Sequence, residues 1–167
     1  IASSNNSIAL YKLGKLYYKG LGVKQDYLKA KKYFELSTCS KAFFKLGHFY
    51  LHGIGIQKNY NKAIGYYKKA INLGNSTALS NLGICYSNGN GVDLNFKKAF
   101  ELFTEAEKLG DSNALNNLGC CYYNGEGVNK DYKKAFEYFQ KASEFGNLNA
   151  INIWVVVILM VMVLSKI

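Results

Sequence analysis

An internal repeat constrains this chain of 167 residues more strongly than any other feature of its sequence. The dipeptide Leu-Gly occurs four times, and each copy is followed by a tyrosine, a Gly-x-Gly segment and a Lys-Ala pair. The leucines are Leu13, Leu46, Leu82 and Leu118, so the steps are 33, 36 and 36 residues. Steps of this length are typical of repeat proteins, in which a single unit cannot bury its apolar face alone and stacks on its neighbours.

Each repeat predicts two helices, A and B, joined by a glycine turn. In the first repeat, Ala9, Leu13 and Tyr17 are four residues apart and share one face of helix A. Gly14 lies beside that face, where the missing side chain lets a neighbouring helix approach closely. The Gly-x-Gly segment is expected to end helix A with positive φ angles, which glycine adopts at low cost. N-cap residues of helix B are expected at Asp26, Asn59, Asn95 and Asp131.

Helix B carries alanines and aromatic residues at i, i+4 and i+7, which predicts an inward-facing stripe. The stripe consists of Ala30 and Phe34, then Ala63, Tyr67 and Ala70, then Ala99, Phe103 and Ala106, and finally Ala135, Phe139 and Ala142. Closing glycines of helix B are expected at Gly74, Gly110 and Gly146, and caps of the next helix A at Ser40, Ser76 and Ser112. The first repeat is three residues short and lacks a closing glycine, which predicts a tighter connection there.

These features predict an all-α fold, an α-solenoid of antiparallel helix-turn-helix repeats. The repeats are expected at residues 9–41, 42–77, 78–113 and 114–149. Residues 1–8 are interpreted as the end of a preceding repeat, and residues 150–167 as an aberrant apolar tail.

The repeats resemble the Sel-one-like repeat family, a branch of the tetratricopeptide superfamily. The match to A-x-x-x-L-G-x-x-Y-x-x-G-x-G-V-x-x-D-x-x-K-A is close in repeats one, three and four. It is looser in repeat two, which has Ile56 for Val and Asn59 for Asp. The resemblance implies a TPR-like superhelix that serves as a scaffold for protein complexes, in signalling or protein quality control, with helix A lining a concave face.

The tail departs from the repeat. A fifth Leu-Gly is due at residues 154–155, but the chain has an apolar run of twelve residues from Ile153 to Leu164, shorter than the about 20 that a membrane span needs. Residues 153–167 can be back-translated into codons that, read in a shifted frame, encode LGGCYSNGNGVIKD. The first eleven residues of this peptide match residues 82–92 in ten positions. We therefore expect that a one-nucleotide deletion near Asn152, or a sequencing error, shifted the frame inside a fifth repeat and truncated the protein. A short membrane or partner anchor is the alternative, and an apolar tail also favours self-association.

The formal net charge of +10 comes from 21 lysines without a single arginine. Because nucleic-acid readers favour arginine, we interpret the lysines as a solvated surface that attracts acidic partners, with nonspecific nucleic-acid binding as a minor alternative. The cysteines are Cys39, Cys85, Cys120 and Cys121, without a C-x-x-C pair. Unpaired cysteines are typical of a reducing compartment, so we expect a cytoplasmic protein.

The sequence contains no recognisable catalytic set. His48 and His52, the only histidines, lie four residues apart, but two ligands do not complete a zinc site, and Phe49 replaces the metalloprotease glutamate. An S-x-x-K motif is absent, and the Gly-x-Gly turns recur in every repeat, unlike a phosphate loop. We expect no enzyme, no cofactor and no metal. The resemblance offers a hydrolase as the alternative, because some relatives have been assigned β-lactamase activity.

The helix A positions not used for packing predict a groove for a protein or peptide partner. The candidate residues are Lys12, Lys15, Lys19, Lys45, His48, His52, Asn81, Asn88, Asn117 and Asn124, with the aromatic residues Tyr11, Tyr18, Phe44 and Tyr123 among them. The resemblance to tetratricopeptide domains implies that the residue before Leu-Gly faces the ligand. Lysines there would attract an acidic segment, and asparagines would bond a peptide backbone. The alternative is that these are merely solvated residues of the repeat.

Overall fold

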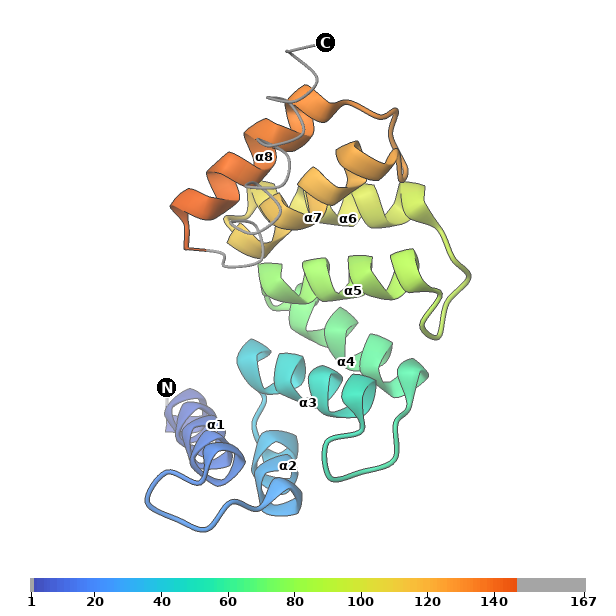
Figure 1. Cartoon of the computed structure of the whole chain (residues 1–167). Helices are drawn as coiled ribbons and strands as arrows, with labels where there is room; N and C mark the ends of the chain where they lie inside the picture. The colour runs from blue at the N-terminus through green and yellow to red at the C-terminus, as the bar shows by residue number, and fades with distance from the viewer. Residues whose placement is uncertain (1, 147–167) are drawn as a thin grey trace.

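The computed structural model describes residues 2–146, which form eight helices and, within that range, no strand. The helices are α1 (Ala2–Lys19), α2 (Tyr27–Leu36), α3 (Ser40–His52), α4 (Tyr60–Asn72), α5 (Ser76–Asn88), α6 (Phe96–Lys108), α7 (Ser112–Asn124) and α8 (Tyr132–Glu144). Consecutive helices pack as the hairpins α1–α2, α3–α4, α5–α6 and α7–α8, which follow one another in a row (Figure 1). This arrangement confirms the predicted α-solenoid.

The predicted inward stripe of helix B forms the core of each hairpin. Every alanine and aromatic residue of that stripe is at most 3% exposed, and Phe34, Tyr67 and Phe139 are completely buried. On the facing helices, Leu46 and Leu118 are also completely buried. Burial of these side chains is the main driving force for pairing the helices of a hairpin.

The glycine of each Leu-Gly pair lies directly under an aromatic ring of helix B. A Cβ atom on Gly47 would lie 2.5 Å from Cε1 of Tyr67, and one on Gly83 would lie 2.5 Å from Cε1 of Phe103. Both distances are shorter than any real van der Waals contact. The close approach predicted for these glycines is therefore confirmed, and it brings the two helices of one hairpin together.

The Gly-x-Gly turns connect one repeat to the preceding one. Their glycines have the predicted positive φ angles, such as 70° at Gly53 and 64° at Gly55. A Cβ on Gly55 would meet Cβ of Tyr27 at 2.7 Å, and one on Gly91 would meet Cβ of Tyr60 at 2.5 Å. Tyr27 and Tyr60 are the first residues of α2 and α4. In the second, third and fourth turns, the second glycine thus packs on the beginning of helix B in the previous repeat.

The predicted N-caps of helix B are confirmed. The side chains of Asp26, Asn59, Asn95 and Asp131 each accept a hydrogen bond from the backbone N–H three residues later, at 2.8 to 3.0 Å. These bonds satisfy one of the free N–H groups at the start of each helix.

The predicted serine caps of helix A are wrong by one residue. Ser40, Ser76 and Ser112 are the first helical residues, and the caps are Cys39, Asn75 and Asp111. Asn75 accepts a hydrogen bond from the N–H of Ala78. Asp111 instead turns its carboxylate to α5, where the Ser80 hydroxyl donates to it at 2.5 Å. This cap residue therefore joins the start of α7 to α5.

The three missing residues of the first repeat shorten a helix and not the connection. Helix α2 has 10 residues and α4 has 13, whereas residues 37–39 and 73–75 are connections of equal length. At the shortened end, the Ser37 hydroxyl donates to the backbone oxygen of Ser7 at 2.8 Å, and the Thr38 N–H donates to the Ser7 hydroxyl at 2.9 Å. The prediction of a tighter connection is therefore wrong, because the deletion removes almost one helical turn.

Residues 2–8, which we interpreted as the end of a preceding repeat, belong to the same helix as the first Leu-Gly. The predictions for residues 147–167, including the frameshift and the apolar tail, lie outside the described residues. Among the described residues, no helix combines the length and the apolar character of a membrane span.

Candidate partner-binding surface

Five of the predicted partner-binding residues come together on helices α1 and α3. Lys15 and Lys19 are one turn apart on α1, and Lys45, His48 and His52 follow one side of α3. We call these five residues the basic patch. Helix A of neighbouring repeats also makes contact further along the chain, at α5 and α7, which indicates that the A helices follow the inner side of the curve. The patch thus lies on the A helices, and its role as part of a binding groove stays a prediction.

Lys45 is the central residue of the basic patch. Its ammonium group lies 5.3 Å from the ring centroid of Tyr18 and 5.8 Å from that of Phe44. Burial lowers the pKa of Lys45, and the positive charges of Lys15 and Lys19 lower it further. Within the described residues, none of these three lysines forms an ion pair with a carboxylate. The three like charges therefore repel one another, and no carboxylate of the described residues compensates them.

The two histidines extend this patch along α3. Their ring centroids are 4.4 Å apart. Burial, followed by the positive charges of His52 and Lys45, lowers the pKa of His48 from 6.5 to about 4, so its ring is neutral at pH 7. The Nδ1 atom of His48 is buried and has no hydrogen-bond partner among the described residues. No cluster of three metal-binding side chains occurs in the described part of the chain.

We expect the stability of the protein to fall as the pH drops from about 6.5 to about 4, in part because of His48. The folded state binds the His48 proton more weakly than the unfolded state, so unfolding takes up a proton in that window. The full shift corresponds to roughly 3 kcal/mol, and solvent screening at a half-buried ring reduces the expected loss to about 1–2 kcal/mol. Urea unfolding at about pH 7 and about pH 4.5 measures it.

The control is His48→Ile, because Ile84 occupies the equivalent position of the third repeat. The variant loses less stability over the same pH interval, by the amount that His48 contributes. An identical pH dependence in both proteins contradicts this assignment.

The other predicted residues lie outside the basic patch. Lys12 is exposed, and no described interaction connects it to the patch. The amide of Asn81 donates to the backbone oxygen of Thr77 at 2.9 Å, and Asn117 is half-buried on α7. Asn88 and Asn124 are exposed at the ends of α5 and α7, and the Asn124 amide lies 3.3 Å from Oε1 of Glu126. The candidate residues of helix A are thus basic in repeats one and two and amides in repeats three and four.

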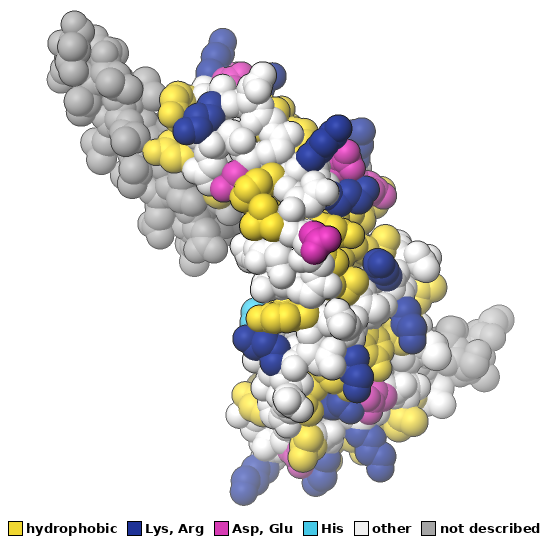
Figure 2. Space-filling model, turned by 90° about the vertical axis from the view of Figure 1, so that its right-hand side faces the viewer, with side chains coloured by type: hydrophobic (Ala, Val, Ile, Leu, Met, Phe, Trp, Pro, Cys, Tyr) yellow, Lys and Arg dark blue, Asp and Glu magenta, His cyan; other side chains and the backbone are white. Residues whose placement is uncertain are grey.

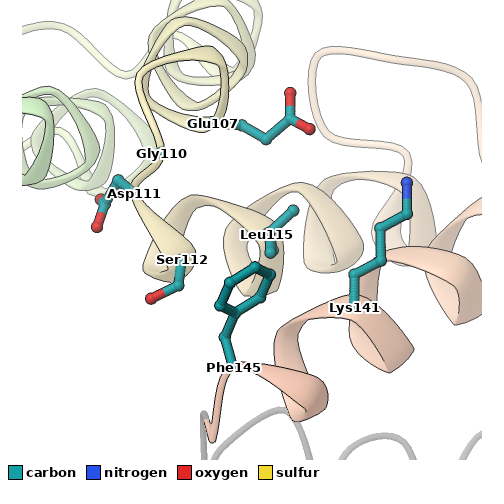
Figure 3. A pocket seen from close by; sticks show the side chains of 7 residues that line it. All are labelled: Glu107, Gly110, Asp111, Ser112, Leu115, Lys141 and Phe145. Carbon is teal, nitrogen blue, oxygen red and sulfur yellow. The ribbon is translucent and has the colours of Figure 1, made fainter.

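A small cavity of about 200 Å³ lies where α6, α7 and α8 meet. Figure 3 shows Glu107 and Lys141 on two sides of this cavity, with Leu115 and Phe145 between them. The seven lining residues include neither histidine nor cysteine, and the Asp111 carboxylate among them is bonded to Ser80. This cavity therefore lacks a nucleophile paired with a general base.

The cysteines do not provide a reactive thiol on this surface. Cys85 and Cys121 are buried, as their repeat position predicted, and all four cysteines are unpaired. Burial raises the pKa of Cys85 to about 11, and burial together with the charges of Glu126 and Cys120 raises that of Cys121 to about 12. Both thiols are protonated at neutral pH, which makes them poor nucleophiles.

Sequence analysis missed a second cavity, of about 420 Å³, between α2, α3 and α4. It is lined by Glu35, Tyr50, Lys62, Gly65, Tyr66 and Lys69. The signal that points to it is a departure from the repeat, since Gly65 aligns with Lys32, Glu101 and Glu137 in the other repeats.

A row of antiparallel helical hairpins with a polar inner surface defines the class of α-solenoid repeat proteins. The Sel1 repeat model matches residues 7–39, 40–75, 76–111 and 112–147, and the chain therefore belongs to the Sel1 repeat family. These matches begin two residues before the boundaries that we predicted from the spacing. Sel1 repeat proteins are generally protein-interaction scaffolds, and the fold is typically non-catalytic. None of the curated proteins matches this sequence.

Solved structures support the same assignment. A Sel1 repeat protein from Oxalobacter formigenes is 29% identical with a TM-score of 0.85, and the match covers 89% of this chain and 60% of that one. The protective antigen c5321 of uropathogenic Escherichia coli is 31% identical with a TM-score of 0.75, covering 86% and 32%. Cysteine rich protein B of Helicobacter pylori is 32% identical with a TM-score of 0.59, covering 80% and 98%. The chain thus spans 60% and 32% of the length of the first two.

Proposed function

We propose that this chain is a non-catalytic scaffold that holds an acidic segment of another protein on the basic patch. The observation that carries the proposal is the position of Lys45, half-buried beside Lys15 and Lys19 without a carboxylate partner in the described residues. An acidic side chain placed among these lysines relieves their mutual repulsion. Such relief favours the complex over the free protein, and it favours acidic partners over neutral ones.

The aromatic rings around Lys45 support this role. Tyr18 and Phe44 hold its ammonium group through cation–π contacts, which fix the position of a long and otherwise mobile side chain. A positioned charge loses less entropy on binding than a free one. The asparagines of repeats three and four supply donors and acceptors for a peptide backbone. We therefore expect the acidic end of the bound segment to lie over repeats one and two.

The test is the affinity for a fluorescent peptide rich in Glu and Asp, measured by anisotropy beside a matched peptide of Gln and Asn. We expect the acidic peptide to bind more tightly, and the Lys15→Glu/Lys45→Glu variant to bind it at least about tenfold more weakly, which is about 1.4 kcal/mol. Affinity is also expected to fall with added salt.

The control variant is Lys97→Glu/Lys133→Glu, which makes the same change in net charge at exposed lysines of α6 and α8. It is expected to change the affinity less than about twofold, a small fraction of 1.4 kcal/mol. Circular dichroism melting confirms that both variants are folded. Equal weakening by the two variants assigns the binding to net charge and contradicts the proposal.

The same titration with a DNA duplex tests the nucleic-acid alternative. On the face shown in Figure 2, lysines are distributed along the length of the molecule, with carboxylate, apolar and uncharged side chains between them. DNA binding that is tighter than peptide binding, and that does not depend on Lys45, contradicts the proposal.

The hydrolase alternative gains no support from the cavities or from the relatives. As part of this proposal, the four unpaired cysteines favour the reducing cytoplasm.

A further inference from the structure

The cavity between α2, α3 and α4 combines two stacked tyrosines with two lysines, and we call it the lysine–tyrosine cavity. The rings of Tyr50 and Tyr66 are nearly parallel, with 5.6 Å between their centroids. The Lys62 ammonium lies 5.3 Å from the centroid of Tyr50, and the Lys69 ammonium lies 5.4 Å from that of Tyr66. Tyr50 is two residues away from both His48 and His52, which corresponds to a rotation of about 200° around the axis of α3. This cavity therefore opens on a different side of α3 from the basic patch.

The cavity contains the one repeat position at which the usual ion pair is missing. In the other repeats, the lysine near the start of helix B faces a carboxylate. The pairs are Lys29–Asp26 at 3.7 Å, Lys98–Glu101 at 3.1 Å and Lys134–Asp131 at 3.9 Å. The equivalent Lys62 forms no ion pair within the described residues. Two substitutions explain this. Asn59 stands where repeats one and four have an aspartate, and Gly65 stands where repeats three and four have a glutamate.

Gly65 leaves open space between the two lysines. A Cβ atom built on it meets nothing within 4 Å. It lies in the middle of α4, three residues after Lys62 and four before Lys69, so both lysines are on its side of the helix. Glycine in a helix interior is unfavourable, and neither a close packing contact nor a positive φ angle accounts for it here.

Repeat four contains the same arrangement of two stacked tyrosines and two lysines, together with the carboxylates that repeat two lacks. Tyr122 and Tyr138 are stacked at 5.6 Å, and the ammonium groups of Lys134 and Lys141 lie 5.3 Å and 5.8 Å from these two rings. Glu137 occupies the position of Gly65, and its charge contributes to raising the pKa of Tyr138, after burial and Glu107. Repeat two thus has the same pair of stacked rings and the same two lysines, without the internal anion.

The one carboxylate in the lysine–tyrosine cavity is already engaged. Glu35 lies 2.6 Å from the ammonium of Lys31. Burial first, and then the Glu35 charge, raises the pKa of Tyr66, which places this carboxylate at the Tyr66 side of the cavity. Lys62 and Lys69, both exposed, therefore have no carboxylate partner among the described residues.

We infer that the lysine–tyrosine cavity binds an oxyanion, a phosphoryl or carboxylate group, between Lys62 and Lys69 over Gly65. The anion takes the place that Glu137 occupies in repeat four. Two lysines that approach one anion from opposite ends neutralise a doubly charged group, and phosphate is such a group near neutral pH. This site is separate from the basic patch and does not depend on the function proposed for it.

The experiment titrates the whole chain with inorganic phosphate, and separately with acetate, while NMR follows the ε-CH₂ signals of isotopically labelled lysines. We expect the Lys62 and Lys69 signals to move to saturation, with phosphate bound more tightly than acetate. The exposed Lys97 is expected to show only a small linear drift. Tighter binding of acetate identifies a carboxylate as the preferred group within the same site. Linear drift of Lys62 and Lys69 overturns the inference.

The matched variants are Gly65→Glu and Gly65→Gln, which fill the same space with and without a charge. Both residues favour a helix more than glycine does, so neither variant is expected to unfold the protein. We expect Gly65→Glu to weaken phosphate binding at least tenfold and Gly65→Gln to weaken it clearly less. Unchanged binding to Gly65→Glu, or equal loss in both variants, overturns the inference. The converse variant Asp131→Asn/Glu137→Gly is expected to create a second phosphate site at Lys134 and Lys141.

Discussion

Replacing Gly127 with alanine is expected to destabilise the protein by about 2–5 kcal/mol. Gly127 has a φ of 75°, and a residue with a side chain pays about 1–2 kcal/mol for this left-handed conformation. The new Cβ would also collide with the carbonyl oxygen of Phe96 and with Cα of Lys97, at 3.0 Å from the latter. Overpacking of this kind costs about 1–3 kcal/mol, and a helix backbone cannot rotate away as a side chain can. Urea unfolding followed by circular dichroism measures the loss.

The control for this prediction is Gly22→Ala. Gly22 occupies the same position of the first turn and has a φ of 71°, but a Cβ there meets nothing within 4 Å. Only the conformational cost of about 1–2 kcal/mol is expected. The difference between the two variants therefore measures the contact of a turn with the preceding repeat. If both variants lose the same stability, that contact contributes nothing to the solenoid.

Replacing Gly83 with alanine is expected to cost about 1–3 kcal/mol by a different route, inside one hairpin. The Cβ would lie 2.5 Å from Cε1 of Phe103, a ring that is only 3% exposed and has no free space to move into. The helices α5 and α6 would then have to separate. Because these two helices share the core of their hairpin, we expect the whole unfolding transition to shift to lower urea concentration.

A double-mutant cycle tests this explanation. Phe103→Leu removes the ring, so Gly83→Ala is expected to cost at least about 1 kcal/mol less in that background than in the wild type. Gly65→Ala is the control for the substitution itself, because its Cβ meets nothing and alanine favours the helix. It is expected to stabilise the protein by about 0.5–1 kcal/mol. Additive effects of Gly83→Ala and Phe103→Leu contradict the proposed collision.

Much of the fold was predictable because it depends on contacts close in the chain. The N-cap bond of Asp26 spans three residues, and the stripe of Ala30 and Phe34 follows from the helical period. The errors occurred where two local solutions compete. By residue type Ser40 is a better N-cap than its neighbour Cys39, but Cys39 holds the cap position, because the start of α3 is decided by how the chain leaves α2. From the sequence alone, the deletion of three residues in the first repeat can be placed in a helix or in a loop equally well.

The candidate sites were predictable only in part. The spacing along α1 and α3 placed Lys15 and Lys19 on one helix, and Lys45 and His48 on another. That Lys45 is half-buried close to the other two lysines follows from the packing of one repeat on the next, which no spacing reveals. The lysine–tyrosine cavity was missed because its tyrosines and lysines look like ordinary repeat residues. The alignment of Gly65 with Glu101 and Glu137 was the signal in the sequence.

The sequence by itself determined the helices, the caps of helix B and the pairing of helices into hairpins, since these rest on helical periodicity and on hydrogen bonds between near neighbours. Only the tertiary structure decided how far each charged side chain is buried and which like charges come together. The ion pairs are local, since each joins residues three or four positions apart. The burial of Lys45 and its approach to Lys15 and Lys19 depend instead on distances between helices of different repeats, and contacts such as that of Gly91 with Tyr60 set such distances.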